Sequence, residues 1–242
     1  MMNLKRRLPL LLVAALHLVG MVSSVDSNIP IPTTILESGS EFPMLGLAID
    51  GTPEKEVTQR IYDAMQNSTK YLNYDLTQRN ENQQRVSDGI VLAVKSSALH
   101  DSRVHVTYRI SYTYLGYERT KLAVQEGLKA LKSRNTHVHL MLEWPRCDDN
   151  IPWMNCEEDE KKLPASVKNA GPPPHLNKEF AFVDSWRALE DIYLREVSLG
   201  EDLAPVASIG VSNFEVEDLQ TLEMHSRVLP HILQVSDYCV VR

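Results

Sequence analysis

Apolar residues follow two periods along this chain, and the two periods alternate. Short stretches rich in β-branched and aromatic residues indicate strands, whereas apolar residues spaced three or four positions apart indicate amphipathic helices. We predict strands over 71–76, 104–110, 137–143, 206–211 and 232–238, and helices from 54 and over 118–132, 182–193 and 216–224. Strand and helix alternating in units of roughly 30 residues is typical of a parallel sheet with crossover helices. The pattern therefore predicts an α/β fold.

The segment 146–178 interrupts this alternation. It contains Cys147, a run of charges over 157–162 and the sequence Gly171-Pro172-Pro173-Pro174. Three consecutive prolines prevent a continuous helix or strand, so we predict a long loop. In a βα barrel, a long loop at the carboxyl end of a strand shapes the substrate site.

The first residues resemble a targeting segment. Lys5, Arg6 and Arg7 precede an apolar stretch over 8–22, and small residues follow at 23–24. This succession is typical of a signal peptide. We predict that residues 1–24 are a signal peptide or, alternatively, a membrane anchor, followed by an extended lead-in over 25–43. A secreted or lumenal protein, or a membrane-anchored one, is expected.

Charge and cysteine content narrow the function further. The net charge of -7 argues against nucleic acid as a partner, because phosphate contacts require a basic surface. Cys147 and Cys156 either form a local disulfide or remain as two free thiols. None of the three cysteines has metal-ligand spacing with histidine, so we assign no metal site.

Four sequence stretches, in this order, resemble the aldo-keto reductase family: 115–120 (LGYERT), 140–145 (LMLEWP), 185–190 (SWRALE) and 209–214 (IGVSNF). The resemblance covers residues from about 45 to 234 and implies a (β/α)8 barrel of the TIM type that reduces a small carbonyl substrate with NADPH. The barrel would occupy 44–242 as about six βα units, since the chain ends before the position of the family's last two strands.

The same resemblance implies the catalytic residues. Asp75 matches the family's aspartate, Arg109 occupies the lysine position and Glu143 occupies the histidine position. The family's proton-donating tyrosine has no counterpart, because Asn80 lies there in an ungapped alignment and Gln78 in a gapped one. Tyr74 is expected to face the outer helices instead, since strand neighbours point to opposite faces. We therefore predict a catalytically impaired reductase.

Two interpretations of Glu143 remain open. A protonated Glu143 in an apolar barrel mouth would donate a proton to the substrate. Alternatively, Arg109 favours the carboxylate form and the two residues make a structural ion pair that occupies the old site. We favour the structural pair.

The resemblance also implies a cofactor site. Ser212, Asn213 and Gln234 match the residues that bind the nicotinamide carboxamide, and Trp144 is expected in the substrate pocket. Asn213 alternatively caps the following helix. The family's phosphate-binding segment lies beyond Arg242, so weakened NADPH binding is expected. The alternatives are a non-catalytic barrel that binds a small molecule or a protein, a fragment of a longer enzyme, or a barrel completed by a partner chain.

Overall fold

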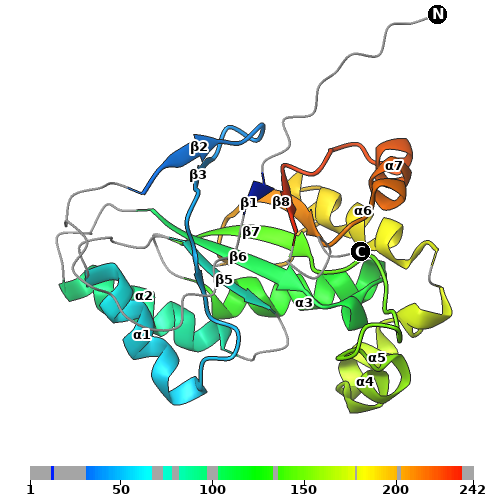
Figure 1. Cartoon of the computed structure of the whole chain (residues 1–242), viewed down its shortest axis with the longest axis horizontal. Helices are drawn as coiled ribbons and strands as arrows, with labels where there is room; N and C mark the ends of the chain where they lie inside the picture. The colour runs from blue at the N-terminus through cyan, green and yellow to red at the C-terminus, as the bar shows by residue number, and fades with distance from the viewer. Residues whose placement is uncertain are drawn as a thin grey trace, which may run out of the picture.

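The computed structural model describes residues 12–13, 31–66, 73–77, 82–96, 103–132, 136–177, 179–200 and 203–235. Within them, seven strands form one sheet in the order β1-β9-β8-β7-β6-β5-β4, and every neighbouring pair is parallel. A separate antiparallel hairpin pairs β2 with β3. The sheet curls into an incomplete βα barrel, which confirms the predicted fold class (Figure 1).

The strands are β1 (Leu12–Val13), β2 (Thr33–Ile35), β3 (Glu41–Pro43), β4 (Leu47–Ala48), β5 (Asn73–Thr77), β6 (Val104–Ile110), β7 (Thr136–Leu142), β8 (Val206–Ser212) and β9 (Ile232–Gln234). The helices are α1 (Glu54–Gln66), α2 (Gln83–Ser96), α3 (Tyr117–Ala130), α4 (Cys156–Lys162), α5 (Ala165–Asn169), α6 (Ala181–Tyr193) and α7 (Val216–His225). Two 3₁₀ turns, Tyr112–Tyr114 and Pro174–Leu176, complete the described elements.

The hydrophobic core lies between the outer face of the sheet and the helices. In Figure 1, α1, α2 and α3 lie below the sheet and the β2–β3 hairpin lies above it. Apolar strand residues on the outer face are fully buried against the helices, among them Val106, Leu140 and Val211. Tyr74 is also buried in this core, as predicted from strand alternation. The outer face therefore supplies the stability of the barrel.

The inner face of the same strands is unusually polar. Thr107 and Arg109 alternate with the apolar residues of β6, and His139 lies on the inner face of β7. The hairpin covers one end of this interior, where the Phe42 ring meets His139 edge-on with centroids 4.8 Å apart. The Ser40 hydroxyl donates to the Ala207 carbonyl at 3.0 Å and holds the hairpin there. Barrel interiors are usually filled with branched apolar residues, so this interior is built for polar contacts.

Several sequence predictions need correction in detail. The lead-in predicted over 25–43 contains the paired strands β2 and β3, and the long loop predicted over 146–178 contains α4 and α5. The strand predicted over 232–238 ends at Gln234 within the described residues. Helix α2 was not predicted, although its buried residues Val86, Ile90 and Ala93 recur at helical spacing.

Most of the targeting segment predicted over 1–24 lies outside the described residues. Leu12 and Val13 are the exception, and they form β1 beside Leu233 and Gln234 of β9. None of the helices that the structure describes is long and apolar enough to span a bilayer.

Candidate active site

The three residues predicted as catalytic converge at one end of the sheet. Asp75 lies on β5, Arg109 on β6 and Glu143 directly after β7, and all three side chains point into the barrel interior. Parallel strands bring their carboxyl ends together, which explains how residues 34 positions apart meet. The shared site predicted from the sequence is therefore present in the fold.

The Arg109 guanidinium is the centre of this site. Its Nε donates to Asp75 Oδ1 at 2.8 Å, and its Nη2 donates to Asp50 Oδ2 at 2.5 Å. Its Nη1 lies 3.8 Å from Glu143 Oε1, which is a longer contact. The predicted pairing of Arg109 with Glu143 is thus the weakest of three, and the two aspartates hold the guanidinium.

Burial and charge oppose each other at Arg109. Burial alone would lower the pKa of the guanidinium, but the carboxylates of Asp75, Glu143 and Asp50 outweigh it and raise the pKa above its ordinary value. Arg109 is therefore a permanent cation. A permanent cation can orient a carbonyl oxygen but cannot give it a proton.

Asp50 is a site residue that the sequence did not reveal. It follows β4, and its Oδ1 accepts the Thr77 backbone N–H at 2.9 Å while its Oδ2 accepts from Arg109. Strand β4 has only two residues, so the sequence contains no alternation of apolar and polar residues that would predict this strand. The one sequence feature that could have indicated Asp50 as a site residue is its position directly before Gly51 and the helix start at Thr52-Pro53.

Gln234 connects the charged site with the predicted cofactor residues. Its Nε2 donates to Asp75 Oδ2 at 2.9 Å, so Asp75 bridges Gln234 and Arg109. Its Oε1 is buried and has no hydrogen-bond partner among the described residues. A buried acceptor without a partner is costly. The amide oxygen is therefore available to an incoming N–H donor.

Asn213 does not cap α7, contrary to one of the two sequence predictions. Glu215 occupies the N-cap position, and the Asp218 carboxylate accepts its backbone N–H at 3.1 Å. Asn213 instead has a positive φ of 60° and donates from Nδ2 to the Glu143 carbonyl at 3.1 Å. Asn213 thus ties the end of β8 to the end of β7, with buried Ser212 beside it.

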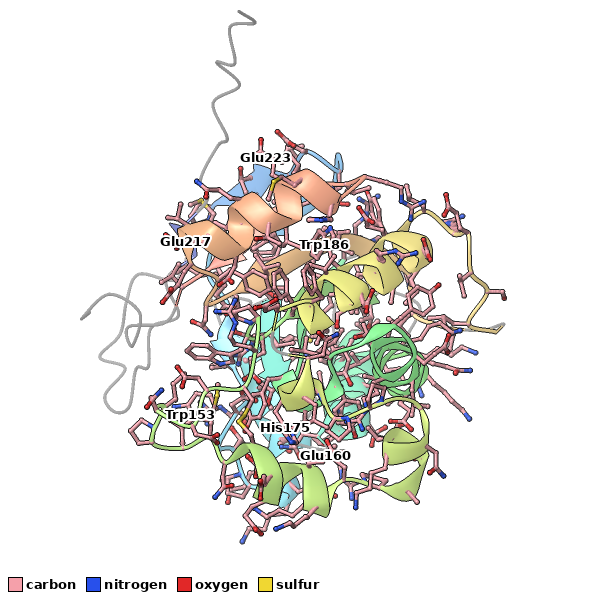
Figure 2. All side chains as sticks on the ribbon, turned by 90° about the vertical axis from the view of Figure 1, so that its right-hand side faces the viewer. Trp153, Glu160, His175, Trp186, Glu217 and Glu223 are labelled. Atoms are coloured by element: carbon pink, nitrogen blue, oxygen red, sulfur yellow. A yellow bond between two sulfur atoms is a disulfide. The ribbon has the colours of Figure 1, made fainter. Side chains whose placement is uncertain are left out.

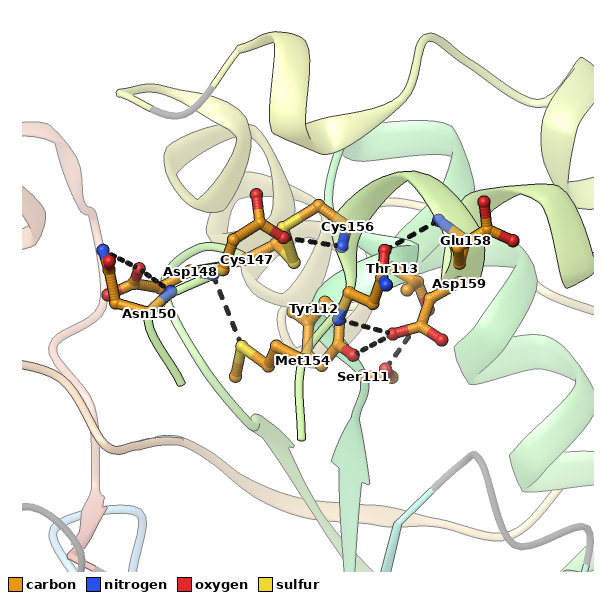
Figure 3. Close-up of a disulfide and its surroundings, with 12 residues drawn as sticks. Ser111, Tyr112, Thr113, Cys147, Asp148, Asn150, Met154, Cys156, Glu158 and Asp159 are labelled. Carbon is orange, nitrogen blue, oxygen red and sulfur yellow. Dashed lines mark hydrogen bonds between the residues drawn. A yellow bond between two sulfur atoms is a disulfide. The ribbon is translucent and has the colours of Figure 1, made fainter. Parts of the chain in front are cut away.

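Trp144 lies beside the site and meets the long loop. Its ring contacts Trp153 edge-on, with centroids 5.6 Å apart. A disulfide between Cys147 and Cys156 closes the segment that carries Trp153, which resolves the alternative left open by the sequence (Figure 3). The loop is therefore fastened beside the end of β7.

The two candidate positions for the family tyrosine, Gln78 and Asn80, lie outside the described residues. Their side chains are an amide in both cases. The sequence also contains no tyrosine between Asp75 and Tyr108. No phenol from this segment can reach the site.

Comparison with known proteins finds relatives that agree with the resemblance seen in the sequence. No known protein-family model matches the chain. The NAD(P)H-dependent D-xylose reductase of Kluyveromyces lactis is 23% identical over 209 residues, which are 85% of this chain and 59% of that protein. The glyoxal reductase of Bacillus subtilis is 24% identical over 204 residues, 84% of this chain and 57% of that protein. The chain spans less than two thirds of the length of these relatives.

Solved structures agree with the sequence relatives. An aldo/keto reductase from Brucella melitensis superposes with a TM-score of 0.60 at 22% identity, covering 85% of this chain and 62% of the other. A Bombyx mori aldo-keto reductase in complex with NADP gives a TM-score of 0.61 at 18% identity, covering 86% and 59%. Fold and site thus define a βα barrel with a polar mouth at the carboxyl ends of its strands. The chain is similar to aldo-keto reductases in sequence and in fold, as its motifs predicted.

Proposed function

We propose that this protein is related to nicotinamide-dependent carbonyl reductases and that its own catalysis of carbonyl reduction is strongly impaired. The observation that carries this proposal is the position of Arg109, whose guanidinium is held by Asp75 and Asp50 at the centre of the site. The residues that would act on a carbonyl are thereby engaged with one another. The family relatives are reductases that use NAD(P)H, and their activity is the coarse expectation for this chain.

Proton supply is the step in which this site is deficient. Reduction of a carbonyl requires a proton at the oxygen when hydride arrives at the carbon. Arg109 remains charged, and Glu143 faces its guanidinium, where a carboxylate accepts hydrogen bonds rather than donating them. A non-catalytic barrel that binds a small molecule is the alternative, because the Arg109 guanidinium is already held by Asp75 and Asp50.

The nicotinamide end of the cofactor fits the residues that are present. The unpartnered Gln234 Oε1 would accept from the carboxamide NH₂, and Ser212 and Asn213 lie buried beside it as further polar groups. The bound cofactor would supply hydride. We propose NADPH as this cofactor, held weakly because the Gln234 amide group already engages Asp75.

Fluorescence titration with NADPH tests the binding half of this proposal. We expect saturable binding that Gln234→Leu weakens at least about fivefold, because a hydrogen bond from the carboxamide is lost. The matched control is Gln59→Leu, an exposed amide on α1 that bonds only Asp63 at 2.8 Å. Equal affinities for the parent protein and Gln234→Leu would contradict the assigned role.

The cellular location is a separate proposal. We propose that residues 1–24 direct the chain into the secretory pathway, as a secreted, lumenal or membrane-anchored protein. The disulfide of Cys147 and Cys156 supports an oxidising compartment. N-terminal sequencing of the lumenal product tests it, and a lumenal chain that retains Met1 without membrane association would contradict it.

The described sheet has β4 at one edge and β1 at the other. Unpaired strand edges are open to further pairing. We propose that further strands, from a longer chain or from a partner chain, complete the barrel. Native mass spectrometry of the purified protein distinguishes a monomer from a paired assembly.

A further inference from the structure

A cavity of about 590 Å³ lies on the outer side of β6, away from the Arg109 site. Tyr108 lines it, while its strand neighbour Arg109 points into the barrel interior. Neighbouring strand residues face opposite sides of a sheet, so the two sites lie on opposite sides of β6, and the Trp153 ring on the cavity rim contacts Trp144 beside the Arg109 site. The proposed reductase chemistry therefore makes no use of this cavity.

The cavity is built from aromatic rings. Its lining includes Tyr108, the 3₁₀ turn Tyr112–Tyr114 and the Trp153 indole. Tyr108 rests directly on α3 at Gly127, where an added Cβ would lie 2.4 Å from Cε1 of the ring. Gly127 thus fixes the floor of the cavity. Burial raises the pKa of Tyr108, so the ring remains neutral.

Trp153 forms the exposed rim. In Figure 2, Trp153 lies in the lower part of the view, as Glu160 does, whereas Glu217 and Glu223 of α7 lie in the upper part. The indole is 46% exposed, although its ring contacts Tyr112 at a centroid distance of 6.2 Å. A partly exposed indole that already packs on another ring offers a face to a ligand.

Carboxylates accompany the rings. Glu126 and Asp159 line the cavity, with Lys162 as the accompanying cation. Asp159 accepts the Tyr112 hydroxyl at 2.7 Å, and its hydrogen bonds from Tyr112 and the Asn155 backbone outweigh burial and lower its pKa, so it is ionised (Figure 3). These three lining charges sum to -1.

The ion pair with Lys162 shows that the Asp159 carboxylate binds an ammonium group. Its ammonium lies 3.2 Å from Asp159 Oδ1, although the lysine side chain is 72% exposed. Exposed ion pairs of this kind contribute little free energy, so an incoming ammonium group can replace Lys162. Electron-rich ring faces attract cations in the same way, most strongly for tryptophan.

We propose that this cavity is a second binding site that takes a small aromatic organic cation, a flat ring carrying an ammonium group. The ligand ring packs against the Trp153 indole, which is the exposed ring of the lining, above the buried rings of Tyr108 and Tyr112. Its ammonium group lies between Glu126 and Asp159. Neutral aromatic compounds of the same size lack the electrostatic part of this recognition, and anionic ones are repelled.

Calorimetric titration of the full chain with 2-phenylethylamine tests the site, with the neutral isostere 2-phenylethanol as the paired ligand. We expect the amine to bind with a Kd of about 1 mM or tighter and at least about fivefold more tightly than the alcohol. Trp153→Ala and Glu126→Gln should each weaken amine binding about threefold or more. Both side chains are exposed, and circular dichroism verifies that each variant is folded.

The control is Glu118→Gln, an exposed carboxylate on the same helix that pairs with Lys121 outside the cavity. This variant should bind the amine like the parent protein. Equal binding of amine and alcohol, the absence of saturation below ~10 mM, or equal affinity of the parent protein and both cavity variants would overturn the proposal.

Discussion

At the scale of the residue, the guanidinium of Arg109 lies among three carboxylates, those of Asp50, Asp75 and Glu143. Arg109 side-chain exposure is 16%, and that of Glu143 is 3%. Three carboxylates at the barrel mouth would repel one another without the cation between them. Arg109 is therefore expected to be a structural requirement of the barrel mouth.

We expect Arg109→Met to lower the free energy of unfolding by about 3 kcal/mol, because removing one partner of a buried charge cluster leaves the others uncompensated. Urea denaturation measures this loss. Arg187→Met is the matched control, since Arg187 is 63% exposed and its ion pair with Asp184 is long at 3.7 Å. A loss at Arg109 no larger than at Arg187 would contradict the structural role.

The buried histidines give a second prediction at this scale. His105 Nδ1 lies 2.9 Å from His139 Nε2, and burial, followed by the charge of His137, lowers the pKa of His105 to about 4. The neutral form is thus favoured in the folded state. Stability should be constant above pH ~6.5 and fall between pH 6.5 and 4, by about 3 kcal/mol for His105.

Denaturation across a pH series measures this loss. His105→Gln should flatten the decline, because glutamine has no proton to take up. The exposed His225→Gln serves as the control and should leave the decline unchanged. An equally steep acid transition in His105→Gln would show that other groups cause it.

At the scale of the element, the sequence predicted those strands and helices whose bounds depend on local residue patterns. Strand β6 begins and ends where its β-branched and aromatic run does, over Val104–Ile110. Helix α2 was not predicted, and the packing against α1 explains the glycine at position 89 within it. A Cβ at Gly89 would lie 2.7 Å from Ile61 Cβ of α1. Such contacts between distant helices are not visible in a local pattern.

The residues of the candidate active site also divide into those that the sequence predicted and those that depend on contacts between distant segments. Asp75, Arg109 and Glu143 were found because the resemblance matches them to family positions, and each lies near the end of a predicted strand. Asp50 was not found, because its strand has two residues and its partner Arg109 lies 59 positions away. The misjudged capping by Asn213 has a similar cause, since its amide binds Glu143, which lies 70 positions away.

The long loop carries a prediction of its own. The Cys147–Cys156 bond closes a segment with a sequence separation of 9. A loop of this length restricts the unfolded chain by roughly 2–3 kcal/mol. Thermal unfolding of the Cys147→Ser, Cys156→Ser double variant should show a lower Tm than the parent protein. Unchanged Tm values under non-reducing conditions would show that the bond does not form in the purified protein.

At the scale of the whole molecule, the two faces of the barrel sheet differ in chemistry. Helices α1, α2, α3 and α6 cover apolar strand residues on the outer face. The inner face instead carries Arg109, three carboxylates and the His105–His139 pair. The barrel shape matches that of known reductases, whereas no tyrosine that would supply a proton is found among the described residues of the site.

Steady-state turnover tests this account most directly. NADPH oxidation with a small aldehyde should be undetectable, or at least ~10²-fold slower than for the glyoxal reductase of Bacillus subtilis assayed alongside, because a positioned general acid contributes 10²–10⁴-fold. Rapid NADPH oxidation by the unmodified protein, abolished by Glu143→Ala, would contradict the account and identify Glu143 as the proton donor.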